Sequence, residues 1–272
     1  MTSNWNAPLV AQKTVLPFAQ LTRLFNLEQF TQWPNALGLN QLKSQILADS
    51  LICPDFVCQS QLIETDEYYE QTIYQHKRVP TRPNSWHDLF NGLIWLQFPK
   101  TKALLNQQHI EDISQYGLNP RTLRRNNLTH FDECGVILAV EEGFEFLLEA
   151  LSQHQWHSVF VVHRALWRDK IHCVVFGHAN LEMLLHPFIG LTGKWLGLTV
   201  DSGFSQLSCS QQLSVLDDKL FGQISQSNLF GFKKPLLPIP LLGIPGFCTE
   251  NKQAEFYQNT DYFRPKSVVL VK

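Results

Sequence analysis

The sequence predicts a mixed fold, α+β or α/β, in one domain, residues 1–272. Two kinds of segment predict it: apolar residues that recur at helical spacing, and short β-branched apolar runs of strand length. A third observation concerns the end of the chain, where an apolar but proline-rich segment fits neither pattern. We therefore expect a small sheet wrapped by helices, with an extended C-terminal arm.

The first element is an amphipathic helix from Pro17 to about Phe30. Its apolar residues lie on one face, which predicts packing against the body of the protein: Phe18, Leu21, Leu24, Phe25 and Leu27. Trp33-Pro34-Asn35 ends this helix, and we assign it to an N-terminal helical segment, about residues 1–50.

The body of the protein, about residues 51–233, alternates between the two kinds of element. Extended segments are expected at residues 56–58, 69–79, 135–140 and 173–176. Helices are expected at residues 85–98, 101–114, 145–151, 156–168 and 206–225, and from residue 178 onward. One further helix is expected to begin at Asn119-Pro120, with the asparagine as cap and the proline in the first position.

The arm, about residues 234–272, includes the apolar, proline-rich residues 235–247. Proline fixes φ and lacks an amide hydrogen, so this segment cannot form a helix or a central strand. We expect it to extend over the protein's own core. The alternative is a polyproline-type recognition tail, although such tails are usually more polar.

Composition excludes some classes of protein. A net charge of −2 with 17% charged residues argues against a strong nucleic-acid-binding face, though a local basic groove stays open. The six cysteines are scattered without a C-x-x-C pair, which gives no zinc-knuckle spacing. A secretory leader and an apolar run of membrane-spanning length are both absent from the sequence pattern. The expectation is a reduced, cytoplasmic protein with no membrane partner.

Ionisable residues stand at the ends of apolar elements, where rigidity and access combine. In Trp86-His87-Asp88-Leu89-Phe90-Asn91, His87 could be a metal ligand or a general base, oriented by Asn91. The alternative is structural. Ser85 and Asp88 have the spacing of a capping box, in which Asp88 bonds the backbone amide of the cap.

Two further groups offer ligand atoms. Asp132 and Glu133 precede a buried strand, and adjacent carboxylates there suit a divalent cation, although they also fit ordinary turn or capping chemistry. His178 and Glu182 are one turn apart at an expected strand-to-helix junction, and could bind a metal or form a structural pair.

Clustered arginines are the candidates for binding a phosphate or carboxylate group. They fall in two sets: Arg121, Arg124 and Arg125, and Arg164 and Arg168. The alternative interpretation is that these arginines form salt bridges on exposed helix faces.

Several segments resemble one bacterial family, the domain of unknown function 3025. The similar residues are Trp86 to Asn91 with Trp95, Phe98-Pro99 and Lys102; Leu128 to Glu133; Val175 to Ala179 with Glu182; Pro238 to Gly246; and Tyr262 to Pro265. The resemblance implies no activity, because the family has none established.

The sequence therefore leaves two hypotheses open. In the first, the protein is a hydrolase that uses one divalent metal ion on an anionic substrate, possibly a phosphoester. Its catalytic residues would be His87, Asp132, Glu133 and His178, and its metal ligands His87, Asp132, His178 and Glu182. In the second, the protein is a binding or regulatory protein whose polar residues are caps and networks. The fingerprints of serine hydrolases and nucleotide-binding loops are absent from the sequence.

Overall fold

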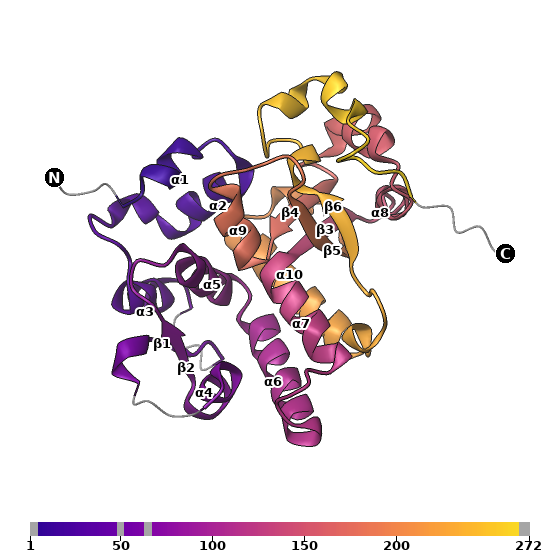
Figure 1. The fold of residues 1–272 in the computed structure, drawn as a ribbon. Helices are drawn as coiled ribbons and strands as arrows, with labels where there is room; N and C mark the ends of the chain where they lie inside the picture. Colours follow the sequence, from indigo (N-terminus) through magenta and orange to yellow (C-terminus); the bar gives the residue numbers. More distant parts are fainter. Residues whose placement is uncertain (1–4, 48–51, 63–66, 267–272) are drawn as a thin grey trace.

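The computed structural model describes residues 5–47, 52–62 and 67–266 and has a mixed α+β fold (Figure 1). It contains a four-stranded sheet in the order β4-β3-β5-β6 and a two-stranded parallel sheet, β1-β2. The strands are β1 (Asp55–Cys58), β2 (Arg78–Thr81), β3 (Gly135–Glu141), β4 (Ile171–Val175), β5 (Thr192–Val200) and β6 (Leu237–Pro240).

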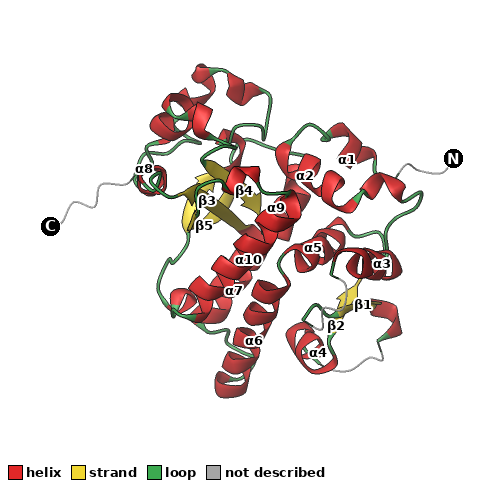
Figure 2. Cartoon of the chain, turned by 180° about the vertical axis from the view of Figure 1, so that it is seen from behind, coloured by secondary structure: helices red, strands yellow, loops and turns green. Residues whose placement is uncertain are grey.

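Helices α5, α6, α7 and α10 run between the two sheets (Figure 2). The helices are α1 (Ala7–Ala11), α2 (Leu16–Phe25), α3 (Ala36–Ile46), α4 (Tyr69–His76), α5 (Trp86–Gln97), α6 (Pro99–Tyr116), α7 (Leu123–Cys134), α8 (Phe146–Ser152), α9 (His178–Leu184) and α10 (Cys209–Ser225). Helix α5 is buried from Asp88 to Gln97, so it lies inside the molecule rather than on its surface. None of the helices in the described residues is long and apolar enough to cross a membrane.

Strand β3 is the centre of the larger sheet, and all of its residues are buried. It pairs antiparallel with β4 and parallel with β5. Strand β5 was not expected from the sequence, because glycines interrupt its apolar pattern. The structure explains them: a Cβ atom at Gly193 would lie 2.4 Å from Val136, and one at Gly197 would lie 2.8 Å from Leu148.

The proline-rich arm covers the core, as expected. Strand β6 pairs only with β5 among the described residues, so it is an edge strand, the position in a sheet that tolerates proline. Beyond it, Leu241 and Ile244 are completely buried. The Tyr262 hydroxyl donates to the carbonyl of Leu191 at 2.6 Å and accepts from the amide of Leu242, which ties the arm to the body.

Residues 69–79 were expected to be extended, and this expectation is wrong: they form helix α4 followed by the start of β2. The Gln71 side chain accepts the amide hydrogen of Tyr68 at 3.1 Å and so closes the first turn. Burial of Thr72 and Ile73 on one face outweighs the β-propensity of these residues.

Two other helix expectations also need correction. The helix expected at Asn119-Pro120 begins at Leu123 instead, because the Thr122 hydroxyl accepts the amide hydrogen of Arg125 and acts as the cap. Residues 156–168 are helical over most of their length but irregular: Trp156 and His157 are α-helical and lead into a π-helix, Ser158–Val162, which is followed by a 3-10 turn, Arg164–Leu166. The Trp167 indole donates to the carbonyl of Val159 at 3.0 Å.

Candidate metal centre

A pocket of about 660 Å³ opens where α4, α5, α6 and α7 meet the start of α9. Its walls carry most of the ionisable residues singled out in the sequence. The lining residues are Gln59, Leu62, Glu67, Tyr68, Tyr69, Glu70, Thr72, Pro80, Arg82, His87, Asp88, Asn91, His109, Arg121, Thr129, Asp132, Glu133 and His178.

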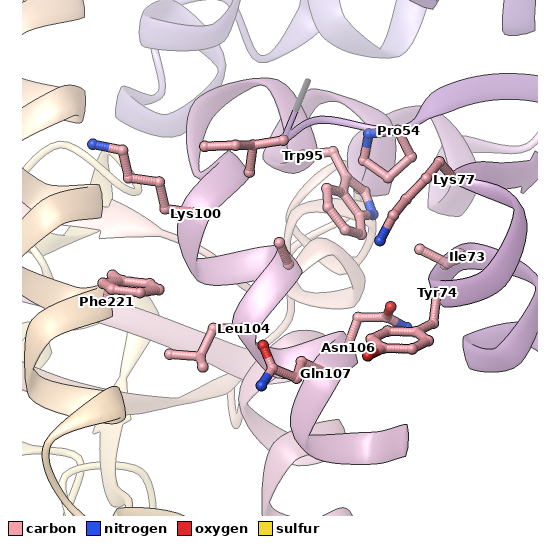
Figure 3. A pocket seen from close by; sticks show the side chains of 12 residues that line it. Pro54, Ile73, Tyr74, Lys77, Trp95, Lys100, Leu104, Asn106, Gln107 and Phe221 are labelled. Atoms are coloured by element: carbon pink, nitrogen blue, oxygen red, sulfur yellow. The ribbon is translucent and has the colours of Figure 1, made fainter. Parts of the chain in front are cut away.

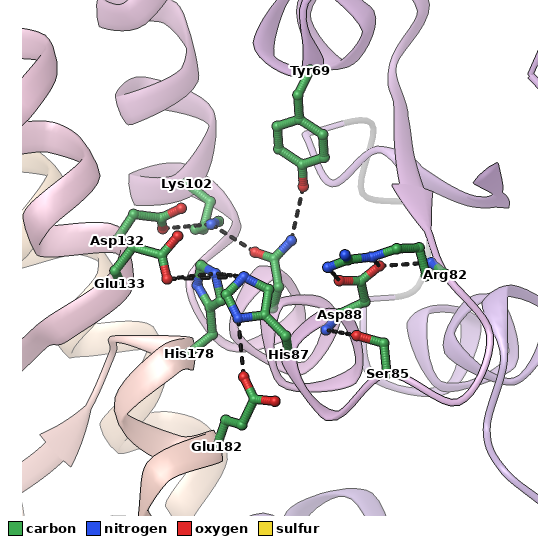
Figure 4. Close-up of polar contacts among 11 residues, drawn as sticks. Tyr69, Arg82, Ser85, His87, Asp88, Lys102, Asp132, Glu133, His178 and Glu182 are labelled. Carbon is green, nitrogen blue, oxygen red and sulfur yellow. Dashed lines mark hydrogen bonds and ion pairs between the residues drawn. The ribbon is translucent and has the colours of Figure 1, made fainter. Parts of the chain in front are cut away.

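Three of these side chains converge on one point, although they come from three different helices (Figure 4). His87 lies in the first turn of α5, Glu133 in the last turn of α7, and His178 is the first residue of α9. The Nε2 atoms of the two histidines are 3.0 Å apart. Oε2 of Glu133 lies 3.4 Å from Nε2 of His178 and 3.9 Å from Nε2 of His87. These three residues are the candidate ligands of a cation, and we call them the metal triad.

The spacing of the triad fits a coordinated cation. A triangle with these three edges has a central point about 2 Å from every corner, which is the usual length of a metal–nitrogen or metal–oxygen bond. Burial lowers the pKa of His178 to about 3, so its imidazole is neutral near neutral pH and its lone pair is available. The donor set is therefore two imidazoles and one carboxylate.

The start of α5 is fixed by a network that also positions His87. The Ser85 hydroxyl accepts the amide hydrogen of Asp88 at 3.2 Å, as the capping pattern predicted. The Asp88 carboxylate, however, does not complete a capping box. It accepts from the Arg82 amide at 2.6 Å and from the Arg82 guanidinium at 3.0 and 2.7 Å. Burial alone would raise the pKa of Asp88, but the bonds from Arg82 outweigh it and the net shift is downward.

Glu182 lies behind His87 rather than among the three converging atoms. Its Oε2 is 3.2 Å from Nδ1 of His87, the ring nitrogen that faces away from His178. A carboxylate in this position holds the imidazole in the tautomer that presents Nε2 to a metal. The pairing of His178 with Glu182, one turn apart on α9, is not made; the nearest partners of His178 are His87 and Glu133.

Asp132 lies beside the triad but in a different interaction. Its Oδ1 is 2.5 Å from Nζ of Lys102, which is 4% exposed and also donates to Oδ1 of Asn91 at 2.9 Å. Burial raises the pKa of Asp132, but Lys102 outweighs it, so the carboxylate stays ionised. Asp132 and Glu133 are in the last turn of α7, not in a turn between elements as one interpretation had it.

Asn91 was expected to orient His87, and this is wrong. Its side-chain oxygen accepts from Lys102, and its amide group donates to the Tyr69 hydroxyl at 2.9 Å. Because the Tyr69 oxygen is the acceptor in that bond, its own proton is left to donate into the pocket. Burial raises the pKa of Tyr69, so this proton is retained.

The five candidate arginines fall in different places. Only Arg121 lines the pocket, where it bonds the Tyr68 hydroxyl and lies 3.5 Å from the Thr129 hydroxyl. Arg124 is paired with Asp112 at 2.6 Å, and Arg125 is 1% exposed and donates to the carbonyl of Leu118 at 2.7 Å.

The second arginine set lies outside the pocket. Arg164 donates to the Tyr257 hydroxyl and to Asn251, both in the C-terminal arm, at 2.9 and 3.0 Å. Arg168 is exposed, with a left-handed backbone conformation at φ 74°.

Sequence reasoning gave no role to Lys102, Tyr69 or His109, all of which contribute to this region. The sequence signal for Lys102 is slight: it directly precedes the apolar residues Ala103-Leu104-Leu105 in α6, but Lys100 and Thr101 stand just before it. His109 is 6% exposed and lines the pocket; burial lowers its pKa to about 4.

The model of one protein family matches residues 54–267, a span that includes every residue of the pocket. The family is described as "Protein of unknown function (DUF3025)". The chain belongs to this family. Searches of curated proteins and of solved structures gave no significant match. Membership in DUF3025 brings no activity with it, so the function has to be argued from the site.

Proposed function

We propose that this DUF3025 protein is a metal-dependent hydrolase in which the metal triad holds one divalent ion. The observation that supports the proposal most strongly is the convergence of His87, His178 and Glu133 at metal-ligand spacing, inside a pocket large enough for a substrate. Two imidazoles and a carboxylate leave coordination positions for water and substrate, as in the His₂Glu sites of catalytic zinc.

The bound ion would supply an activated water, because coordination lowers the pKa of water to about 7. The protein's own residues would do the rest. Glu182 would hold His87 through the bond at Nδ1 and so leave Nε2 free to bind the ion. Asp132 is the ionised carboxylate next to Glu133, and we propose that it acts as the general base that accepts the proton of the attacking water. Lys102 keeps Asp132 ionised and in place.

The proposed substrate is anionic, with a phosphoester as the first class to test. Five carboxylates line the pocket and would repel an anion: Glu67, Glu70, Asp88, Asp132 and Glu133. The metal ion therefore has to supply most of the attraction, together with Arg121. Of the five candidate arginines we keep only Arg121 in this role, because it lines the pocket and has no carboxylate partner among the described residues. Tyr69 would donate its free proton to a substrate oxygen.

The test is hydrolysis of chromogenic phosphomonoesters and phosphodiesters by protein loaded in turn with zinc, manganese and iron(II). His87→Ala and Glu133→Gln should each lower kcat/KM by a factor of about 1,000 or more, the scale of losing a bound metal nucleophile. His186→Ala is the matched control, since His186 is an exposed histidine just beyond the end of α9. No hydrolysis with any metal, or equal activity in all variants, would favour a binding or regulatory protein instead.

A further inference from the structure

A second pocket, which shares no lining residue with the first, lies where α4, α5, α6 and α10 meet (Figure 3). Its volume is about 310 Å³, at the lower end of the range for small-molecule sites. The lining residues are Ile52, Pro54, Ile73, Tyr74, Lys77, Trp95, Lys100, Ala103, Leu104, Asn106, Gln107 and Phe221. We call it the α4–α6 pocket.

The walls of this pocket are apolar and rigid. Ile73, Trp95 and Leu104 belong to the buried core, with exposed fractions of 3%, 2% and 9%. Tyr74 and Phe221 at its margin are 42% and 39% exposed, so aromatic surface continues out to solvent. The apolar part of a ligand would therefore pack against apolar side chains on several sides of the pocket.

The Trp95 indole N–H is the unusual feature of the α4–α6 pocket. The side chain is buried, yet Nε1 has no hydrogen-bond acceptor among the residues that the structure describes. A buried donor without an acceptor costs about 1–3 kcal/mol, so water or a bound ligand usually satisfies such a group. In Figure 3 the ring nitrogen of Trp95 and the ammonium group of Lys77 point into the same space.

The charges around the α4–α6 pocket favour a negatively charged ligand. Lys77 has no carboxylate partner in the described residues; its Nζ lies over the Tyr74 ring at 5.0 Å from the centroid. Lys100 is the second cation, and it is paired with Asp218. The described lining contains no aspartate or glutamate, in contrast to the five carboxylates of the metal-centre pocket. Two N–H donors with an apolar floor match a carboxylate on an apolar body.

We propose that the α4–α6 pocket binds a small apolar carboxylate, whose oxygens accept hydrogen bonds from Trp95 and Lys77 and whose hydrocarbon part packs on Ile73 and Leu104. This site does not depend on the proposed hydrolase function. The Trp95 ring also lies under Nζ of Lys102, 5.3 Å from the centroid, so the indole that would contact this ligand also contacts the cation that holds Asp132.

The test is a titration of ¹⁵N-labelled protein with hexanoate, followed through the indole N–H signals of its seven tryptophans. Trp95→Phe assigns the signal of Trp95. We expect that signal to move downfield and to saturate, because a carboxylate then accepts its hydrogen bond. Hexanamide, which has the same shape without the charge, should bind at least about tenfold more weakly, as expected when a charge-assisted bond is lost.

Three variants make the result specific. Lys77→Met should weaken hexanoate binding about tenfold, and Lys233→Met, which changes an exposed lysine outside the pocket, should leave it unchanged. His87→Ala should also bind hexanoate normally, which separates this site from carboxylate binding at the metal triad. A Trp95 signal that does not saturate, equal affinity for hexanamide, or normal binding by Lys77→Met would each overturn the proposal.

Discussion

The Nε2 atoms of His87 and His178 lie 3.0 Å apart, although the two residues are 91 positions apart in the chain. Two imidazole lone pairs at this distance repel one another unless a proton or a cation lies between them. The Glu133 carboxylate is close to both nitrogens and supplies negative charge on the same side. A proton between the two nitrogens would not bind the Glu133 carboxylate directly. A divalent cation, in contrast, would bind both nitrogens and the carboxylate.

Divalent metal ions should therefore stabilise the folded protein. At a free metal concentration about 100-fold above Kd, the free energy of unfolding should rise by about 2.7 kcal/mol. The measurement is thermal unfolding with and without added zinc, manganese or iron(II). His178→Ala should lose the metal-dependent part, and His186→Ala should keep it. Equal shifts in both variants would place the binding of metal elsewhere.

Glu182→Gln should weaken metal binding without unfolding the protein. The carboxylate orients His87 through Nδ1, and its side chain is 45% exposed, so the packing loss is small. Loss of such a partner typically lowers metal affinity by about 10- to 100-fold. Competition with a chromogenic chelator measures the affinity. The control is Glu255→Gln, an exposed glutamate in the C-terminal arm. Unchanged affinity in Glu182→Gln would mean that His87 is not a ligand held in this way.

Lys102→Met should be strongly destabilising, and a second change should repair it. The single variant leaves Asp132 without its counter-charge and Asn91 without its donor, at a cost of about 3–5 kcal/mol. Lys102→Met with Asp132→Asn removes both charges and should recover most of that loss. Denaturant unfolding of the two variants and of Asp132→Asn gives the coupling energy. A double variant no more stable than Lys102→Met alone would contradict the ion pair.

His109 should make stability depend on pH in a predictable direction. Burial lowers its pKa to about 4 in the folded protein, against about 6.5 for a histidine in an unfolded chain. The unfolded chain therefore takes up this proton first, and stability falls as the pH drops. Between about pH 7 and pH 4 the loss from this group is about 3 kcal/mol. His109→Gln should show a correspondingly shallower pH dependence in urea unfolding. An unchanged slope would show that His109 is not buried as a neutral group.

The residues of the metal triad could be predicted from the sequence, but their relationship could not. His87 and His178 stand at the starts of helices that each bury two or more leucines, a pattern that can be recognised locally. Their convergence depends on α5, α7 and α9 packing together, and that arrangement is set by non-local contacts. The partner of Glu182 could not be predicted for the same reason. Spacing along α9 suggested His178, but the partner is His87, which lies on α5.

The arginines show where sequence reasoning ended. All five had the spacing of an anion clamp, but a guanidinium is available only if no carboxylate or carbonyl already occupies it. Arg124 is already paired with the Asp112 carboxylate, and Arg125 already donates to the carbonyl of Leu118. Strand β5 was missed for a related reason: its glycines look like breaks in the sequence, and only the neighbouring side chains of Val136 and Leu148 explain them.

The most direct measurement is the metal content of untagged protein, purified without chelator, by elemental analysis. We expect close to one equivalent of zinc, manganese or iron per chain in the wild type and in His186→Ala. His87→Ala with His178→Ala should stay folded, as judged by circular dichroism, and lose that metal. A folded wild-type protein that contains no metal, and that takes up none when divalent ions are added, would contradict the metal centre and leave these residues as a structural network.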